Sequence, residues 1–294
     1  WDVRESRTPE QLAAFVSKLR VYTISDQDDS GRWLRLEFPD LFYIVTPSHV
    51  GYKEYYKATW TGISGDRRYR NGPFHKFHLV DNPWLEENII NNHGPLGALY
   101  PRLEYIMEGD TPSYLGLIDN GLGWHISPSY GGWGGRYVLC ATYAENRPIW
   151  TNAEGCQDAV VAEDGVEYIS AQATIWRWRE AFQHDFAARM DWCIADRYED
   201  ANHNPVAVAN GRPGKDVIQI ETRPGRKVAL SAAGTKDPDG DEVAIKWWQY
   251  PEAGTYYVKI DLRRTGPETA ECTAPKVADP KTIHIVLEAT DNGA

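Results

Sequence analysis

The sequence predicts two domains: an α/β layer over residues 1–199 and an all-β domain over residues 203–294. In the first part, helix and strand patterns alternate at short intervals, which is typical of α/β folds with parallel strands. After the segment Asn202–Pro205 the pattern changes to short apolar runs separated by glycine and proline turns, which is typical of a β-sandwich. A chain of 294 residues is also long enough for two domains.

The first helix and the strands near it are predicted from local signals. Residues 8–11 supply a threonine N-cap, a proline in the first turn and a glutamine three residues after the cap. Residues 20–25 then form an apolar strand, residues 31–37 a short helix, and residues 41–46 a second strand. In a parallel sheet, ligands bind beyond the carboxyl ends of the strands, where the acidic loop 26–29 falls.

The middle of the chain has fewer regular elements. After a turn-rich segment, a strand is expected over residues 103–107, followed by a helix that begins at Thr111 and ends near Asn120. Residues 131–137 are expected to form a loop, because four of their first five residues are glycine. The last long helix is expected over residues 173–197. Its expected buried stripe consists of Phe182, Phe186, Met190, Cys193 and Ile194.

The second domain is predicted from four short strands. They cover residues 227–230, 243–248, 256–260 and 283–288. Trp247 and Trp248 are neighbours in one of them, so their side chains point to opposite faces and one of them belongs to the core. The run Asp-Pro-Asp-Gly-Asp at 237–241 is similar to calcium loops but lacks the EF-hand pattern, so a simple turn is the preferred interpretation.

Composition narrows the possible partners. The chain has 12 Trp and 17 Tyr but only 7 Phe, a surplus found in proteins that stack on sugar rings and, equally, in large aromatic cores. With 31 basic and 42 acidic residues its net charge is −11, so we expect no nucleic-acid partner. No run approaches 18 apolar residues, so we expect no membrane span.

The four cysteines have no metal-ligand spacing. None of them forms a Cys-x-x-Cys motif, which argues against a zinc site. In an extracellular protein four cysteines allow three pairings. A Cys140–Cys156 disulfide is the first of these to expect, and free thiols are an equal alternative.

Six segments together carry a resemblance to a known family. They are residues 24–31, 107–113, 131–137, 185–192, 237–242 and 247–255. Through them the chain resembles a family of bacterial exported proteins described as cellulose-binding. The resemblance implies a nucleoside-hydrolase-like α/β domain over 1–199 and an immunoglobulin-like β-sandwich over 203–294. It also implies that an aspartate-rich calcium loop and the first strands would precede Trp1, that a last strand would follow Ala294, and that the protein is secreted or periplasmic.

The resemblance to nucleoside hydrolases also assigns residue roles. Hydrolysis of a nucleoside needs a cation that binds ribose hydroxyls and activates water, and oxygen ligands suit calcium. His184 and Asp185 match a histidine–aspartate pair at the start of a late helix, which implies that His184 is a catalytic acid and Asp185 a metal ligand. Alternatively, Asp185 forms an ion pair with Arg189, one helical turn later.

Glu108 and Asp110 match the position where nucleoside hydrolases carry a sugar-binding Glu-x-Asn, which implies a catalytic role for both. Aspartate in place of asparagine exchanges an amide donor for an acceptor, so the sugar contact cannot be the same. Alternatively, Asp110 stabilises the N-terminus of the helix that begins at Thr111.

Asp26, Asp28 and Asp29 form the acidic loop after the first strand. Three carboxylates within four residues repel one another unless a cation or hydrogen-bond donors lie between them, which favours a substrate-binding loop over a hydrated turn. These aspartates, Glu108 and Asp185 are expected to converge on one cleft, because each follows a strand or begins a helix.

Trp133 is the strongest candidate for substrate binding. Its glycine neighbours permit close approach of a flat sugar ring, although a buried Trp that fixes the loop is as good an explanation. The function predicted for this chain is binding of a cellulose-type polysaccharide. The alternative is a calcium-assisted hydrolase of glycosidic or N-glycosidic bonds, with calcium bound only in an intact protein that carries the aspartate-rich loop.

Overall fold

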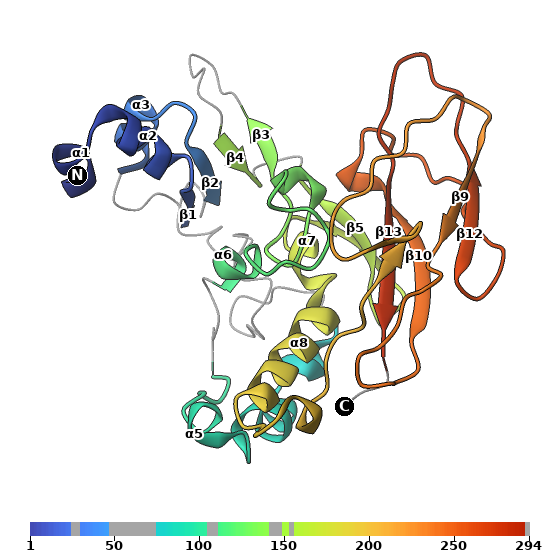
Figure 1. The fold of residues 1–294 in the computed structure, drawn as a ribbon, viewed down its shortest axis with the longest axis horizontal. Coiled ribbons are helices and arrows are strands. Elements are labelled where there is room, and N and C mark those ends of the chain that lie inside the picture. The colour runs from blue at the N-terminus through green and yellow to red at the C-terminus, as the bar shows by residue number, and fades with distance from the viewer. Residues whose placement is uncertain (25–29, 47–74, 105–110, 141–148, 153–155, 292–294) are drawn as a thin grey trace. The chain divides into compact units, whose positions relative to one another are not determined.

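The computed structural model (Figure 1) describes residues 1–24, 30–46, 75–104, 111–140, 149–152 and 156–291. The chain divides into two compact units. Unit 1 comprises Trp1–His75, Tyr105–Leu117 and Trp133–Arg177, and unit 2 comprises Lys76–Glu104, Ile118–Gly132 and Trp178–Ala294. The predicted domain boundary near residue 200 stays a prediction. No helix in the described ranges combines the length and the apolar composition that a membrane crossing requires.

The second helix begins where the sequence predicts, whereas the first was not predicted. Helix α1 (Asp2–Ser6) precedes α2 (Pro9–Val16), which Thr8 and Gln11 cap reciprocally. The Gln11 amide N–H donates to Thr8 Oγ1 at 3.3 Å, and the Thr8 amide N–H donates to Gln11 Oε1 at 3.2 Å. This capping box satisfies two backbone donors that would otherwise lack a partner at the helix start. Helix α3 (Ser30–Glu37) also agrees with the prediction.

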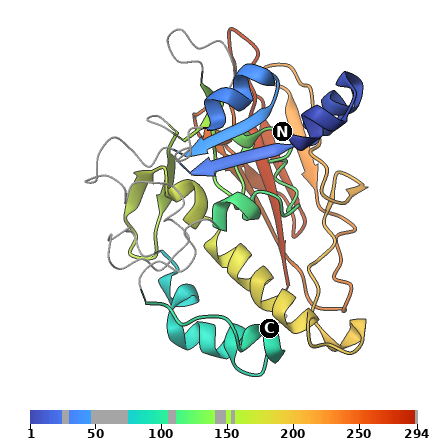
Figure 2. The same cartoon turned by 90° about the vertical axis from the view of Figure 1, so that its left-hand side faces the viewer.

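Unit 1 contains a four-stranded sheet of order β1-β2-β4-β3. Its strands are β1 (Arg20–Ile24), β2 (Phe42–Thr46), β3 (Val138–Cys140) and β4 (Ile149–Thr151). The pairs β1–β2 and β2–β4 are parallel, which confirms the predicted parallel strands, and β3 is antiparallel to β4. Figure 2 shows β1 and β2 as two blue arrows that point the same way. Tyr43 and Ile44 on β2 are buried, so the second strand lies in the core of this unit.

A β-hairpin and a short helix complete unit 1. Strands β5 (Asp158–Val161) and β6 (Glu167–Ser170) pair in antiparallel fashion, and α7 (Ala173–Trp176) follows, with every one of its residues buried. The fully buried Asp158 begins β5. Its carboxylate accepts hydrogen bonds at 2.7 Å from Arg136 Nε and from a terminal nitrogen of Arg177. The buried carboxylate of Asp158 therefore binds two arginine side chains.

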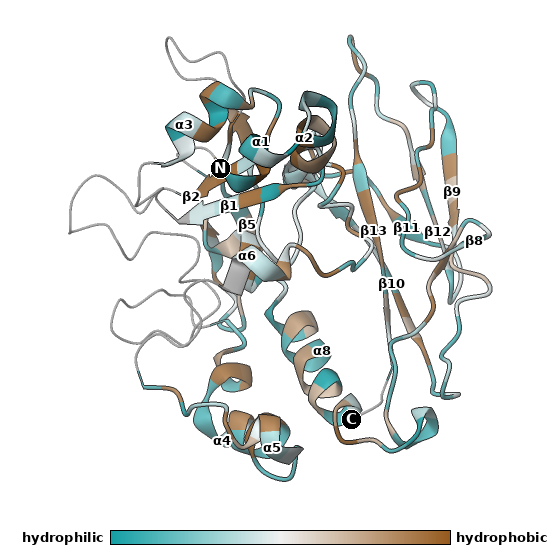
Figure 3. Ribbon diagram, turned by 60° about the vertical axis from the view of Figure 1, so that its left-hand side comes forward, coloured by the Kyte–Doolittle hydropathy of each residue, from teal (hydrophilic) through white to brown (hydrophobic). Residues whose placement is uncertain are grey.

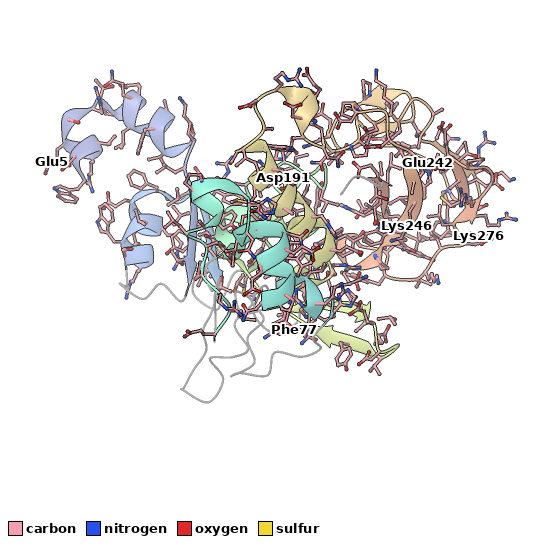
Figure 4. The ribbon with its side chains drawn as sticks, turned by 90° about the horizontal axis from the view of Figure 1, so that it is seen from below. Glu5, Phe77, Asp191, Glu242, Lys246 and Lys276 are labelled. Atoms are coloured by element: carbon pink, nitrogen blue, oxygen red, sulfur yellow. The ribbon has the colours of Figure 1, made fainter. Side chains whose placement is uncertain are left out.

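The helices of unit 2 are mostly short. Before residue 203 they are η3 (Phe77–Val80), α4 (Asn82–Leu85), η4 (Glu86–Ile90), α5 (Gly94–Gly97), η5 (Pro128–Tyr130), α8 (Arg179–Trp192) and η6 (Tyr198–Asp200). His93 joins α8 to the residues before α5. Its Nδ1 lies 2.6 Å from a carboxylate oxygen of Asp191, which Figure 4 labels, and its Nε2 lies 2.9 Å from the Glu87 carbonyl oxygen.

The long helix predicted over residues 173–197 is two helices. Trp178, with φ −98° and ψ 3°, separates α7 from α8. The Trp178 ring packs against Trp248 and Tyr250, at centroid distances of 5.6 and 5.8 Å, and this packing explains the break. Because α8 ends at Trp192, the prediction that Cys193 and Ile194 are buried was wrong, and both are exposed. Of the remaining predicted stripe, Phe182 and Met190 are buried and Phe186 is half-buried.

Two predictions in the middle of the chain need correction. Leu103 and Glu104 belong to no strand, and the rest of the predicted strand lies outside the described residues. The Asn82 side chain binds both backbone groups of Leu103, at 2.6 and 3.2 Å, and so replaces a strand partner. Helix α6 (Thr111–Leu115) begins as predicted but ends well before Asn120. The loop predicted at 131–137 is confirmed.

The region after residue 203 is rich in strands that form several small sheets. Its elements are β7 (Val208–Ala209), β8 (Arg212–Pro213), β9 (Lys227–Ser231), β10 (Ala244–Tyr250), η7 (Pro251–Ala253), β11 (Arg263–Arg264), β12 (Thr269–Thr273) and β13 (His284–Thr290). Strand β10 pairs with β13, and β12 pairs with both β11 and β9, all antiparallel. Apolar residues occur along β13 (Figure 3). Three predicted strands are confirmed, and the immunoglobulin-like topology stays a prediction.

The strand predicted over residues 256–260 does not form. The Gln249 side-chain amide donates to the Val258 carbonyl oxygen at 3.0 Å and accepts from the Ile260 amide N–H at 2.8 Å. A side chain therefore satisfies backbone groups that a neighbouring strand would otherwise bind. The segment is held against β10 without joining its sheet.

The two tryptophans of β10 face opposite sides, as predicted. Trp248 lies on the face that packs against Trp178, and its Nε1 donates to Glu288 at 3.1 Å. The same Glu288 carboxylate binds Lys246, which Figure 4 labels, at 3.0 Å. Trp247 donates from Nε1 to the Glu268 carbonyl oxygen at 3.2 Å, just before β12. Each indole is half-buried with its N–H satisfied, so the prediction that one of them belongs to the core was wrong.

All four cysteines are free thiols in the structure. This is the second of the two alternatives, and no disulfide joins Cys140 to Cys156. Cys156 is buried, and its thiol donates to the Arg136 carbonyl oxygen at 3.1 Å. Burial raises the pKa of this thiol to about 11, whereas Cys193 is exposed. Because the thiolate is the reactive form, a thiol reagent at pH 8 should modify Cys193 in the folded protein and leave Cys156 unmodified.

Mass spectrometry of peptides after timed alkylation measures this order of reactivity. The same reaction in denaturant is the control, and there all four cysteines should react. A Cys140–Cys156 peptide that stays linked without reductant would contradict the prediction.

Candidate functional site

The predicted metal ligand Asp185 is buried and forms an ion pair. Its Oδ2 accepts a hydrogen bond from Arg189 Nε at 2.7 Å, and its Oδ1 accepts from a second Arg189 nitrogen at 3.5 Å. The Asn204 side-chain amide also donates to Oδ1, at 3.3 Å. Both carboxylate oxygens are therefore bound by N–H donors, as in the helical ion pair that was the alternative interpretation.

His184 is the neighbour of Asp185 on α8 but points elsewhere. Its side chain is exposed, and its ring meets the edge of Trp84 at a centroid distance of 6.2 Å. Consecutive helical residues point about 100° apart, so one of this pair is buried and the other lies at the surface. An exposed imidazole lacks the enclosed surroundings in which an active site tunes a catalytic acid.

The described residues do not fit a calcium ion. Calcium takes six to eight oxygen ligands, and within the described ranges no group of three His, Cys, Asp or Glu side chains is arranged to hold a metal. Asp185 already directs both oxygens toward Arg189 and Asn204. A guanidinium on this carboxylate supplies the positive charge that a metal would otherwise bring.

The other predicted acidic site residues lie outside the described part of the chain. They are Asp26, Asp28, Asp29, Glu108 and Asp110. Their convergence with Asp185 on one cleft stays a prediction.

Trp133 is the partly exposed residue of an otherwise buried loop. Every other residue of 131–137 is buried, and Trp133 alone in this segment is half-buried. Gly131 has φ +75°, and a Cβ added to it would lie 2.4 Å from the Tyr250 hydroxyl oxygen. Gly131 is thus closely packed, and the Trp133 indole is partly exposed.

Hydrogen bonds fix the end of this loop. The Tyr137 hydroxyl donates to the Gly134 carbonyl oxygen at 2.9 Å and lies 2.6 Å from the Tyr22 hydroxyl on β1. Thr46 on β2 donates to the Tyr22 hydroxyl at 3.0 Å. Burial holds the pKa of Tyr137 well above its usual value, so the phenol stays a neutral donor. The sheet and the loop that carries Trp133 are therefore held together by hydroxyl groups.

One group of aromatic residues was missed from the sequence. The Tyr198 ring stacks on the His203 ring at a centroid distance of 3.6 Å, and the Trp192 ring lies nearly parallel to His203 at 5.6 Å. Asp239 anchors His203, accepting from its amide N–H at 2.7 Å. The spacing of Trp192, Tyr198 and His203 follows no helix or strand period, and only their aromatic and imidazole character was a signal.

Residues 237–241 form a turn, which was the preferred interpretation of this segment. Asp237 Oδ1 accepts three backbone N–H groups, from Asp239 at 2.7 Å, Gly240 at 3.0 Å and Asp241 at 3.3 Å. An aspartate that caps its own loop in this way is a common turn device. The turn presents Asp239 to His203.

Comparison with known proteins identifies both ends of the chain. A family model described as cellulose-binding Sde182, nucleoside hydrolase-like domain, matches residues 1–137. A second, described as cellulose-binding protein Sde0182, C-terminal domain, matches residues 227–294. No curated protein sequence gives a significant match.

A solved structure supports the same relationship. It is that of a nucleoside hydrolase-related hypothetical protein from Saccharophagus degradans that is associated with carbohydrate metabolism. The two proteins share 34% sequence identity with a TM-score of 0.72, over 100% of this chain and 64% of that one. The chain thus spans less than two thirds of that relative, and it has a nucleoside hydrolase-like fold. One family model matches at each end of the chain and this relative matches across its whole length, so the chain is similar to cellulose-binding Sde182 proteins at both ends, in agreement with the resemblance of its sequence.

Proposed function

We propose that this chain binds a cellulose-type polysaccharide, with Trp133 as one contact. The observation that carries the proposal is the position of Trp133, a half-buried indole on a loop whose other residues are buried. The family models that match the chain describe cellulose-binding proteins, which supports the same ligand class.

The physical basis is a flat apolar surface that needs no rearrangement. A β-linked glucose ring has its hydroxyls at the rim and C–H groups on both faces, and a C–H face packs well on an indole. The loop that presents Trp133 is already fixed by Tyr137, whose hydroxyl donates to the Gly134 carbonyl oxygen. A ligand therefore loses little free energy in ordering the protein.

Hydrolysis is not part of the proposal. The described residue that matches a metal ligand, Asp185, is bound to Arg189, and stacking on an aromatic ring requires no cation. Binding is therefore proposed to be independent of calcium. A polysaccharide of the cell exterior is reached only by an exported protein, so a secreted or periplasmic location is proposed as well.

Retention on microcrystalline cellulose tests the proposal. Trp133→Ala should weaken retention by about tenfold, the effect expected for loss of one central aromatic contact. Trp33→Ala is the matched control, because Trp33 is 37% exposed on α3, where its ring packs against Trp1 and Phe38, and it should leave retention unchanged. Adding a calcium chelator should also have no effect.

Thermal unfolding of each variant shows that the fold is intact. If the wild-type chain washes off cellulose as readily as an unrelated acidic protein, the proposal is wrong. If the chain instead releases sugar or base at a rate that a chelator abolishes, it is a hydrolase.

A further inference from the structure

We propose that Tyr198 is a second sugar-stacking surface, built independently of the Trp133 loop. This inference rests on the proposed function, since it names another place where the same polysaccharide would bind. The surface consists of Tyr198, His203 and Trp192, called here the Tyr198 platform.

The platform presents a flat ring to solvent. The Tyr198 side chain follows α8, in the short helix η6, and is 61% exposed. Its ring is nearly parallel to the His203 imidazole, with an interplanar angle of 9° and 3.6 Å between centroids. At that distance one face of the phenol ring is covered by imidazole, so the exposed area belongs to the opposite face and the edges. An exposed tyrosine without such a support would change rotamers freely.

The layer beneath Tyr198 is itself held in place. His203 Nδ1 lies 3.2 Å from both carboxylate oxygens of Asp239, and its backbone N–H donates to the same carboxylate. Trp192 lies nearly parallel to His203, at an interplanar angle of 16°, and its Nε1 donates to the Asn202 carbonyl oxygen at 2.7 Å. The Arg189 guanidinium lies over the Trp192 ring, 5.2 Å from its centroid.

Polar residues flank Tyr198 on both sides in the chain. Arg197 binds Glu199 at 3.2 Å and Asp200 at 2.9 Å, and Arg197 and Glu199 are both about two thirds exposed. Donors and acceptors at the rim of an aromatic surface suit the equatorial hydroxyls of a pyranose, which point outward from the ring that stacks. This arrangement of a central ring and a polar rim favours a sugar over a purely apolar ligand.

The geometry points to β-linked glucan as the occupant. An aromatic ring that is fixed in place and exposed on one face matches the C–H face of one sugar ring. The tyrosine ring is already ordered before binding, which lowers the free energy lost on association. No charged group of the ligand is needed, in agreement with a neutral polysaccharide and a protein of net charge −11.

The test compares three tyrosine variants of the full chain on microcrystalline cellulose. Tyr198→Ala should lower retention by about tenfold, whereas Tyr198→Phe keeps the flat ring and should bind nearly as wild type. Tyr257→Ala is the matched control, because Tyr257 is 70% exposed but lies outside the stack, and it should also bind as wild type. Thermal unfolding should be similar for all of them, since each side chain is mostly in solvent.

The outcomes separate this inference from the proposed function. If the wild type is retained and Tyr198→Ala is retained equally, the platform is not a sugar site, and the proposed function stands. If Tyr198→Phe loses retention as fully as Tyr198→Ala, the hydroxyl and not the ring face makes the contact, which overturns stacking. If the wild type is not retained at all, both are wrong.

Discussion

Replacing Asp158 by alanine is expected to lower the free energy of unfolding by about 3–5 kcal/mol, because it leaves buried arginine charge uncompensated. Asp158 is fully buried and binds Arg136 Nε and an Arg177 terminal nitrogen, each at 2.7 Å. The exposed fractions of these two arginine side chains are only 7% and 11%, so water cannot replace the lost carboxylate.

Asp158→Asn separates charge from volume, since it keeps the size of the side chain and removes its charge. It should be nearly as destabilising as the alanine variant. Asp164→Ala is the control on the same hairpin, because Asp164 is exposed and its contacts are with the Val166 amide N–H and the Tyr168 hydroxyl. It should destabilise the protein much less than either Asp158 variant, because water can replace the lost contacts of an exposed carboxylate. Chemical denaturation measures the free energy of unfolding of all three variants. Equal losses of this free energy for Asp158→Ala and Asp164→Ala would contradict the role of the buried anion.

Gly131→Ala is expected to lower the free energy of unfolding by about 2–4 kcal/mol through backbone strain and overpacking. Gly131 has φ +75°, a conformation that alanine adopts only at a cost. The added Cβ would also lie 2.4 Å from the hydroxyl oxygen of Tyr250, which is fully buried and cannot move toward solvent.

Gly165→Ala separates backbone strain from overpacking. Gly165 has a similar φ of +77°, but nothing lies within 4 Å of a Cβ added there. This control should therefore lose only the strain term, about 1 kcal/mol. If both glycine variants lose the same free energy, contact with Tyr250 plays no part. Because Gly131 lies two residues before Trp133, its variant should also weaken retention on cellulose.

The sequence was most informative where a few neighbouring residues decide the structure. The capping box at Thr8 depends only on the next three residues, and β1 and β2 depend on continuous apolar runs, so all three were predictable. The family resemblance was predictable for the same reason, because it depended on continuous segments of the sequence. Some of these segments lie within the residues that the first family model matches, and others within those that the second matches.

Predictions failed where a distant side chain decides the local structure. Residues 173–197 have a continuous helical pattern, yet Trp178 leaves it to pack on Trp248 and Tyr250. Residues 256–260 have a strand pattern, yet the Gln249 amide takes over their backbone hydrogen bonds. No local pattern contains that information.

The candidate site was predictable only in part. For Asp185 both roles were open, because Arg189 one turn later was visible in the sequence while the surroundings of the carboxylate were not. The Tyr198 platform was missed because it forms by a reversal of the chain between α8 and His203, which stacks residues of unrelated spacing.

The strand order of the first sheet also determines when that sheet can be completed during synthesis. β2 has β4 as its second neighbour, and about 100 residues separate these two strands in the chain. At about 5–20 residues per second, the ribosome adds β4 roughly 5–20 s after β2. During that interval an apolar strand has one free edge, the kind of surface on which nascent chains associate. Correct folding of this protein therefore depends on keeping that edge separate until its partner has emerged.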